Sequence, residues 1–318
     1  MLRCPVCQSE KDESSYIETY GSSFNNQEYK LYHCETCDLQ WWEPLKIIPE
    51  FYEMEGVDTY EFFHMGLREE IEENHRMFFK YIPLKSGRLL DVGCGDGVFL
   101  KEAQKAGFEV WGIDFDSKSI KVCQEKWGLK NTFVMSPQEF ADFCQKEGLK
   151  FDVITFFEVL EHQDKPVEFL EAIKSMLKPG GYIAGSVPNR ESFENFLLRK
   201  IYTWDYPPNH FLWFSDKALK KLFESLGLKI YIYPIRTYSK TAPLLQIMVM
   251  GNVVNRVIKK AIASKEVIDK KNYDELSIFR KVLFRSLKGL RDIVFSFPIF
   301  ILDFPNKGGT LYFQCEVY

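Results

Sequence analysis

The chain has 318 residues, which is long enough for one large domain and a smaller accessory one. It is 46% hydrophobic and 27% charged, as globular proteins are, and its net charge of −4 gives no overall electrostatic reason to bind nucleic acid. The sequence has no run of about 18 apolar residues that would predict a membrane span. Cysteines stand where the apolar core of a secretion signal would lie, so we expect a cytoplasmic protein whose cysteines are thiols or metal ligands.

Two Cys-x-x-Cys pairs mark the first segment, residues 1–45. The four cysteines are Cys4, Cys7, Cys34 and Cys37. Four thiolates in two such pairs are typical of a zinc ribbon, in which one tetrahedral structural zinc ion joins two turns. A redox pair, chance spacing, or His33 in place of one thiolate remain the alternatives. A segment this small buries too little surface to fold unaided, so the metal would supply the missing stability.

Residues 46–86 are predicted to connect this segment to the next. Pro44 and Pro49 interrupt regular structure, and helical spacing of apolar residues then predicts a helix over 68–81.

The stretch from Leu89 to Leu100 carries the clearest pattern in the chain. An apolar run ends in Asp91, three glycines follow at alternate positions up to Gly97, and an apolar helical pattern then begins. Glycine allows the backbone angles and close approach that a ligand needs beside the positive end of a helix. A second apolar run ends in Asp114, whose carboxylate could accept both hydroxyl protons of a ribose.

Residues 87–187 alternate between apolar runs and amphipathic segments, which predicts a parallel sheet covered by helices on both faces. The strands are expected near 88–92, 109–114, 131–135, 151–157 and 181–187, and the helices near 97–107, 117–127, 137–146 and 165–177.

The rest of the chain is predicted to complete this domain around an insertion. Ser215 and Asp216 could cap a helix over 216–226, a strand follows at 228–235, and residues 308–318 form a final antiparallel strand at the sheet edge. The basic, helical-looking insertion over 239–307 has three interpretations. It is an acceptor-site lid or dimer surface, a solvated face over ordinary packing, or a patch that contacts a membrane peripherally.

Four motifs in series resemble the Rossmann-like S-adenosylmethionine-dependent methyltransferases. They are D-V-G-C-G-D-G, G-I-D-F-D, F-D-V-I-T-F-F-E-V-L-E-H and L-K-P-G-G-Y-I-A, in this order between 87 and 187. The resemblance, which is to the ubiquinone-pathway and sugar methyltransferases, implies an α/β fold. That fold has a seven-stranded sheet with its last strand antiparallel. This chain is expected to add a small N-terminal zinc ribbon and a helical insertion before the last strand. The implied domains are 1–45, 46–86, 87–238, 239–307 and 308–318.

The resemblance also implies roles for individual residues. The residues that would hold S-adenosylmethionine are Asp91, Gly93, Cys94 and Gly95 at the methionine moiety, Asp114 at the ribose, Phe115 and Ser136 at the adenine, and Glu158 on the sulfonium side. Similar enzymes often have an acid at the position of Ser136, and Pro137 removes a backbone donor there. In similar enzymes the segment before the first strand lies over the mouth of the site.

Two histidines lie in the loops that would form the acceptor site. His210 is the first candidate for a general base and His162 the second, and a structural role for His210 within its loop is the alternative. The run Glu158-Val-Leu-Glu161-His162 resembles one that holds a divalent cation in ubiquinone-type enzymes, although many relatives carry similar residues without metal.

The resulting hypothesis is methyl transfer to a small-molecule acceptor, by in-line displacement onto a hydroxyl of a sugar, glycan or secondary metabolite. An RNA base methyltransferase with a zinc docking module is one alternative, and the acidic balance of the chain disfavours it. A non-catalytic scaffold with this fold is the other, and the intact glycine turn disfavours that.

Overall fold

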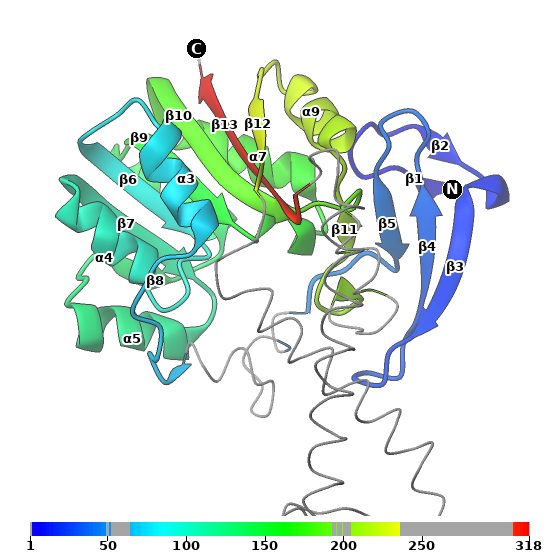
Figure 1. The fold of residues 1–318 in the computed structure, drawn as a ribbon, viewed down its shortest axis with the longest axis horizontal. Helices are drawn as coiled ribbons and strands as arrows, with labels where there is room; N and C mark the ends of the chain where they lie inside the picture. The colour runs from blue at the N-terminus through cyan, green and yellow to red at the C-terminus, as the bar shows by residue number, and fades with distance from the viewer. Residues whose placement is uncertain are drawn as a thin grey trace, which may run out of the picture. The chain divides into compact units, whose positions relative to one another are not determined.

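The structure, a computed structural model, describes residues 2–48, 51, 64–192, 195, 199, 205–235 and 308–317 (Figure 1). The insertion predicted over 239–307 lies outside these residues. Among the described helices, none combines the length and the apolar character needed to cross a membrane.

The larger sheet of the described chain has seven strands in the order β12-β13-β10-β9-β6-β7-β8. Their bounds are β6 Gly87–Val92, β7 Phe108–Asp114, β8 Thr132–Val134, β9 Phe151–Phe157, β10 Leu177–Pro188, β12 Tyr231–Ile235 and β13 Thr310–Val317. The five strands from β10 to β8 are parallel, and β13 runs antiparallel to both of its neighbours. The predicted fold class is therefore confirmed.

Successive residues of the central strands point to opposite faces of the sheet, where two groups of helices cover them. On one face Leu89, Val153 and Tyr312 pack with α3 (Glu73–Tyr81), α4 (Val98–Lys105) and α5 (Ser117–Trp127). On the other face Leu90, Ile154 and Phe313 pack with α6 (Pro137–Glu147), α7 (Pro166–Ser175) and α9 (Asp216–Glu224). This two-sided burial explains why the strands are apolar runs rather than alternating patterns.

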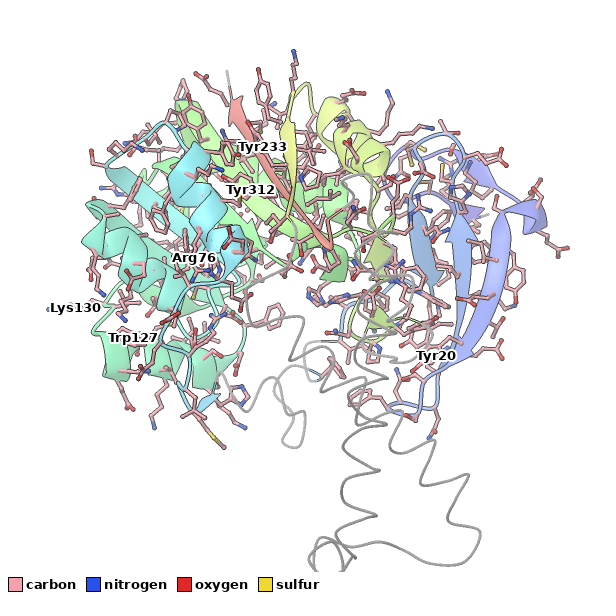
Figure 2. The ribbon with its side chains drawn as sticks, in the orientation of Figure 1. Tyr20, Arg76, Trp127, Lys130, Tyr233 and Tyr312 are labelled. Atoms are coloured by element: carbon pink, nitrogen blue, oxygen red, sulfur yellow. The ribbon has the colours of Figure 1, made fainter. Side chains whose placement is uncertain are left out.

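The last strand differs from its prediction in one respect. Strand β13 lies between β10 and β12, so β12 and not β13 forms the edge of the sheet. Both faces of β13 are buried, whereas β12 contains Pro234, which has no N–H to donate and is tolerated at an edge. Figure 2 shows Tyr233 and Tyr312 side by side on these two strands, with their ring centroids 6.2 Å apart.

A smaller, four-stranded antiparallel sheet combines three strands of the N-terminal segment with one strand from much later in the chain. Its order is β11-β5-β4-β3. Its strands are β3 (Tyr16–Gly21), β4 (Glu28–His33), β5 (Gln40–Glu43) and β11 (Leu212–Trp213), and the pair β1 (Leu2–Arg3) and β2 (Glu10–Lys11) stands beside them. The sequence did not predict β11, which comes from the loop before α9. The buried residues Trp41 and Trp42 of β5 belong to the same apolar cluster as α6, α7 and α9, so the two sheets share a core.

Local side chains set the start of two helices. The helix predicted over 68–81 begins only at Glu73, because a capping box joins Glu72 and His75 at its start. The predicted cap of α9 is confirmed, since the Ser215 hydroxyl accepts from the Ala218 N–H at 3.1 Å.

Candidate active site

The glycine turn joins β6 to α4 and lies beyond the carboxyl end of β6, the middle one of the five parallel strands. Gly93, Gly95 and Gly97 have φ values of 73°, 51° and 78°, in the left-handed region that favours glycine. A Cβ at Gly93 would lie 2.5 Å from Cγ2 of Val159. A Cβ at Gly97 would lie 2.8 Å from Sγ of Cys123. The turn is therefore restricted to glycine by conformation at all three positions, and also by space at Gly93 and Gly97.

Asp114, at the tip of β7, faces this turn. Its Oδ2 accepts from the Gly95 N–H at 2.9 Å and its Oδ1 from the Asp116 N–H at 2.9 Å. Burial raises the pKa of Asp114 to about 6, although these hydrogen bonds oppose the shift. The carboxylate is thus fixed in orientation beside the glycine turn.

Asp91 is buried at the end of β6 and is held by one hydroxyl. Thr155 Oγ1 donates to its Oδ1 at 2.7 Å. Burial raises the pKa of Asp91 to about 7, and the neighbouring Asp114 adds to the shift while Thr155 and Arg68 oppose it. A cation placed beside this carboxyl would stabilise its charged form.

The predicted site residues come together around one cavity of about 570 Å³. All ten line it, namely Asp91, Gly93, Cys94, Gly95, Asp114, Phe115, Ser136, Glu158, His162 and His210. Ser136 also begins α6, where its hydroxyl donates to Glu139 Oε2 at 2.6 Å and accepts from the Glu139 N–H at 3.3 Å. A ligand that binds the Ser136 hydroxyl would therefore compete with Glu139 for it.

The segment before the first strand reaches the same cavity. Arg68 lines it and pairs with Asp96 of the glycine turn, with Nη2 2.6 Å from Oδ1. His75 also lines it, and its Nδ1 accepts from the Glu72 N–H at 3.1 Å. Burial lowers the pKa of His75 to about 3, so the ring is neutral and its proton is on Nε2. The sequence placed this segment near the site but did not single out these two residues.

Glu158 forms part of the cavity wall next to β9. It has φ of 54°, which is unfavourable for a side chain with a Cβ, and its Oε1 accepts from Ser186 Oγ at 2.6 Å. Asn74 donates in turn to Ser186 Oγ at 3.1 Å. Burial raises the pKa of Glu158 to about 7. These bonds hold a strained residue in one position.

The two histidines lie against each other, with ring centroids 4.7 Å apart. His210 Nδ1 donates to Asp205 Oδ1 at 2.5 Å, and Asp205 also pairs with Arg199. His162 Nδ1 donates to the Asn209 carbonyl at 2.5 Å, and burial lowers the pKa of His162 to about 3. In both rings the proton on Nδ1 is fixed by an acceptor.

Glu161 is a buried carboxyl beside these rings. Neither of its oxygens has a hydrogen-bond partner among the described residues, and Oε1 lies 4.0 Å from His210 Nε2. Burial raises the pKa of Glu161 well above its ordinary value. Ligand atoms of Glu161, His162 and His210 lie within 4.8 Å of one another, so this trio could hold a cation.

Asp205, like Arg68 and His75, was not singled out from the sequence. Nothing in its neighbourhood distinguishes an acid five positions before a histidine from an ordinary loop acid. Glu161 was noted only within its motif, and the cation trio pairs it with His162 and the distant His210 rather than with Glu158.

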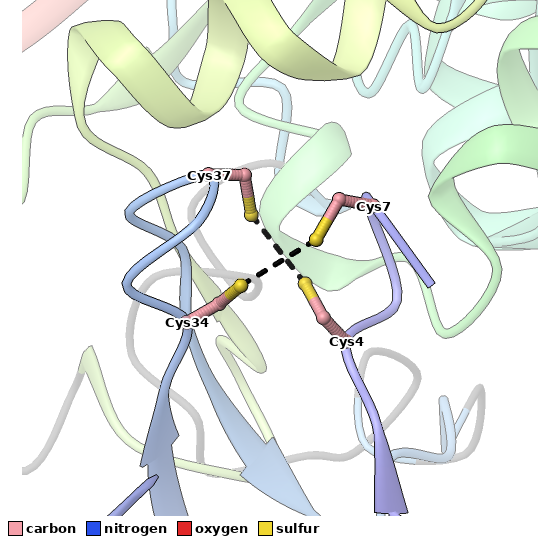
Figure 3. A group of neighbouring side chains, drawn as sticks. All are labelled: Cys4, Cys7, Cys34 and Cys37. Atoms are coloured by element: carbon pink, nitrogen blue, oxygen red, sulfur yellow. Dashed lines mark hydrogen bonds between the residues drawn. The ribbon is translucent and has the colours of Figure 1, made fainter. Parts of the chain in front are cut away.

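The four N-terminal cysteines meet in one cluster (Figure 3). Sγ of Cys4 lies 3.5 Å from that of Cys37, and Sγ of Cys7 lies 3.5 Å from that of Cys34. Four sulfur ligands at ~2.3 Å from a tetrahedral ion would lie about 3.8 Å apart. The number, chemistry and spacing of the sulfurs therefore fit such an ion.

The two turns that carry these cysteines have the same backbone geometry. Gln8 and Asp38, each directly after the second cysteine of its pair, have φ of 58° and 65°. Their N–H groups donate to the carbonyls of Cys4 at 3.0 Å and Cys34 at 2.6 Å. Paired turns of this kind direct both thiols of a Cys-x-x-Cys toward one point.

Comparison with known proteins identifies the family. A family model described as a methyltransferase domain matches residues 63–231. The ubiquinone biosynthesis O-methyltransferase of Bordetella avium (strain 197N) is 31% identical over 146 residues, which are 42% of this chain and 60% of the relative. That of Actinobacillus pleuropneumoniae serotype 7 (strain AP76) is 37% identical over 110 residues, 32% of this chain and 46% of the relative. The chain thus spans about half the length of the curated relatives it matches.

A solved structure agrees with this assignment at the level of the fold. It is a chain from the complex of the Haloferax volcanii Trm112 methyltransferase activator with a methyltransferase. The match has a TM-score of 0.51 and 13% identity, and it covers 82% of this chain and 95% of that one. The chain belongs to the methyltransferase domain family and has the Rossmann-like fold of the S-adenosylmethionine-dependent enzymes.

Proposed function

We propose that this protein transfers a methyl group from S-adenosylmethionine to a hydroxyl group of a small molecule. The observation that carries the proposal is that one cavity is lined both by the residues expected to hold the cofactor and by His162 and His210. The cofactor supplies an activated methyl group, and the protein aligns the acceptor with it.

The cofactor would take the side of the cavity formed by the glycine turn. Asp91 and the backbone of Gly93 and Gly95 would hold its amino acid moiety, since a carboxylate and close backbone suit an ammonium group. Asp114 would accept from the ribose hydroxyls. Phe115 would flank the adenine, and Glu158 would lie toward the sulfonium.

His210 is proposed as the base that removes the proton from the acceptor hydroxyl. Because its Nδ1 donates to Asp205, the lone pair is on Nε2, and that atom can accept a proton. Asp205 would stabilise the charged imidazolium that forms, as an acid does behind a catalytic histidine. Asp205 is thus proposed as a positioning residue.

The acceptor class divides into two alternatives within the same chemistry. The relatives named above are ubiquinone biosynthesis O-methyltransferases, which favours a phenolic hydroxyl. The resemblance to sugar methyltransferases, noted in the sequence, favours a sugar or glycan hydroxyl.

We also propose that the cysteine cluster binds one structural zinc ion. Four sulfur donors leave no open position for a substrate, so the ion would stabilise the fold rather than take part in the reaction.

The first experiment is calorimetric titration of S-adenosylhomocysteine into the purified chain, with zinc measured on the same sample. We expect a dissociation constant of about 1–10 μM and about one zinc per chain. Methyl transfer from labelled cofactor would then be measured to 3,4-dihydroxybenzoate and to methyl glucoside, as phenolic and sugar probes. A folded, zinc-loaded sample that binds no S-adenosylhomocysteine would contradict the proposal and favour a non-catalytic scaffold.

A second candidate mechanism uses a divalent cation to orient the acceptor. Its support is the buried Glu161 carboxyl, which lies beside two imidazoles and whose oxygens have no hydrogen-bond partner in the part of the chain that the structure describes. Both imidazoles also have the Nδ1–H contact that typically orients metal ligands. Under this mechanism chelation would stop turnover, Mn²⁺ or Mg²⁺ would restore it, and Glu161→Gln would not respond to either ion. Turnover that withstands chelation would favour the metal-free base.

A further inference from the structure

We propose that the N-terminal ribbon is the anchor of the loop that carries Asp205 and His210. In this proposal, which rests on the proposed function, the ribbon positions the acceptor-side residues and is not a docking module for another molecule. The key contact is between Arg190 and the second cysteine turn, Cys34–Asp38.

The loop enters the ribbon's sheet immediately after His210. Strand β11 pairs antiparallel with β5, so that Leu212 lies opposite Trp41 and Trp213 opposite Gln40. The Trp42 N–H donates to the Phe211 carbonyl at 3.0 Å. Figure 1 shows β11 beside β5, although more than 160 residues separate them in the chain.

The other side of the same loop is bonded to the methyltransferase core. The Phe211 N–H donates to the Glu161 carbonyl at 3.0 Å, within the short helix η2 (Leu160–His162). His162 Nδ1 donates to the Asn209 carbonyl. Phe211 is therefore bonded to the methyltransferase core through its N–H and to the ribbon through its carbonyl. His210 is the residue directly before it.

Asp205 is held by an aromatic group that includes a ribbon residue. Trp213 Nε1 donates to the Asp205 carbonyl at 2.8 Å. The Trp213 ring packs edge-on against Trp42 of the ribbon, with centroids 5.4 Å apart and planes at 88°. Tyr206 lies 5.3 Å from Trp42 and 5.4 Å from Trp213, which closes the group.

The second cysteine turn is itself fixed to the core. Arg190 Nη2 donates to Asp38 Oδ2 at 2.6 Å and to the Asp38 carbonyl at 3.1 Å. The Arg190 N–H donates to the Phe214 carbonyl at 2.8 Å, at the end of the loop. Lys217 Nζ also donates to the Glu35 carbonyl at 3.2 Å. One arginine thus connects the turn that would hold the metal to the strand that follows His210.

These contacts are inconsistent with a separate docking module. The large side chains Trp41 and Trp42 are fully buried, and the cluster that contains them continues into the helices of the core. The ribbon and the loop share hydrogen bonds, aromatic packing and an ion pair. Loosening the ribbon should therefore displace His210, while the glycine turn, in another part of the cavity wall, should keep its position.

The test compares two arginine variants in the full zinc-loaded chain. Arg190→Met removes the ion pair between ribbon and core but keeps the apolar stem. Arg3→Met removes an ion pair within the ribbon, where Arg3 Nη2 lies 3.0 Å from Glu10 Oε1, and serves as the matched control. Zinc content and S-adenosylhomocysteine affinity are measured for both, and neither should change by more than about twofold.

The decisive measurement is hydrogen exchange of the backbone in 205–214. We expect Arg190→Met to raise exchange there about tenfold, with no change in 93–97, and Arg3→Met to change neither. For methyl transfer to whichever probe is accepted, Arg190→Met should lower kcat about tenfold without changing the KM for S-adenosylmethionine, and Arg190→Lys should restore part of the loss.

Two results would separate this proposal from the proposed function. Unchanged exchange in 205–214 of a folded, zinc-loaded Arg190→Met would overturn the anchoring. Increased exchange in a chain that transfers no methyl group would support the anchoring and count against the enzyme. If Arg190→Met does not fold, Asp38→Asn serves in its place, because Asn tolerates the φ of 65° and removes the charge together with one of the two acceptor oxygens.

Discussion

The glycine-turn side of the cavity and the ribbon side of the cavity are built in different ways. On the glycine-turn side, β6, the turn and the tip of β7 supply Asp91 to Asp114 from one continuous stretch. On the ribbon side His210 lines the cavity. It and the residues linked to its loop, Asp38, Glu161 and Asp205, come from three distant segments. The first side is a local motif that is proposed to hold the cofactor, and the second is a tertiary assembly. Damage to each should therefore have a distinct consequence.

Substitution of His210 should give the largest effect and should affect turnover alone. Loss of a general base typically costs about 10²- to 10⁴-fold, so we expect His210→Asn to lower kcat about 10³-fold. The affinity for S-adenosylhomocysteine should change less than about threefold. Parallel kinetics and calorimetry would check this, and a comparable loss of cofactor affinity would show that the two sides are not separable.

Substitution of Asp114 should have the opposite consequence. Two hydrogen bonds to a charged acceptor contribute about 3 kcal/mol together, so Asp114→Ala should weaken S-adenosylhomocysteine binding about 100-fold. Asp142→Ala, an exposed acid on α6, is the control and should have no effect. Calorimetry at one pH compares the S-adenosylhomocysteine affinities of the two variants. Equal affinities would refute the proposed ribose contact.

The glycine turn offers a third test, with a control of matched backbone strain. Gly93→Ala would place a Cβ 2.5 Å from Val159 at φ of 73°, whereas Gly128→Ala has φ of 69° with nothing within 4 Å. Strain of about 2 kcal/mol at the turn should weaken S-adenosylhomocysteine binding about 30-fold. Gly128→Ala should lower only the melting temperature. If both variants bind equally well, the close approach at Gly93 is not needed by the ligand.

The smallest of these effects are two dependences on pH. One is that of the stability of the ligand-free chain, and the other is that of cofactor binding. Because burial raises the pKa of Asp91 to about 7 and that of Asp114 to about 6, both carboxyls hold protons more tightly in the folded than in the unfolded chain. Their contribution to the free energy of unfolding of the ligand-free chain therefore falls as pH rises from about 4 to about 7. Arg68 and Asp116 are the other charged groups that influence this pair.

Ligand binding should show the reverse trend. An ammonium group and ribose hydroxyls favour the ionised carboxyls, so S-adenosylhomocysteine affinity should rise about tenfold between about pH 5 and about pH 8. Calorimetry across this range checks the slope, and Asp114→Asn should reduce it by removing one of the two carboxyls. A flat profile would mean that neither carboxyl changes its protonation on binding.

Much of the fold could be predicted from the sequence because its signals are local. The predicted strand at 151–157 and helix at 117–127 match β9 and α5, since continuous apolar runs and caps such as Asp116 act within one element. The late start of α3 depends on the capping box at Glu72, which apolar spacing does not reveal. The position of β13 inside the sheet, rather than at its edge, depends on the burial of both of its faces, which is a property of the folded chain.

For the candidate site, the sequence by itself determined the glycine turn, Asp114 at the end of the next strand and the four cysteines, because each lies in a short motif with its own spacing. Only the tertiary structure decided that Asp205 lies behind His210, that Glu161 lies beside it with no hydrogen-bond partner for its carboxyl among the described residues, and that Arg190 joins the core to the second cysteine turn. These relations depend on β11 leaving the core to pair with β5. Pairing between segments so far apart follows from the packing of whole surfaces, which no local pattern encodes.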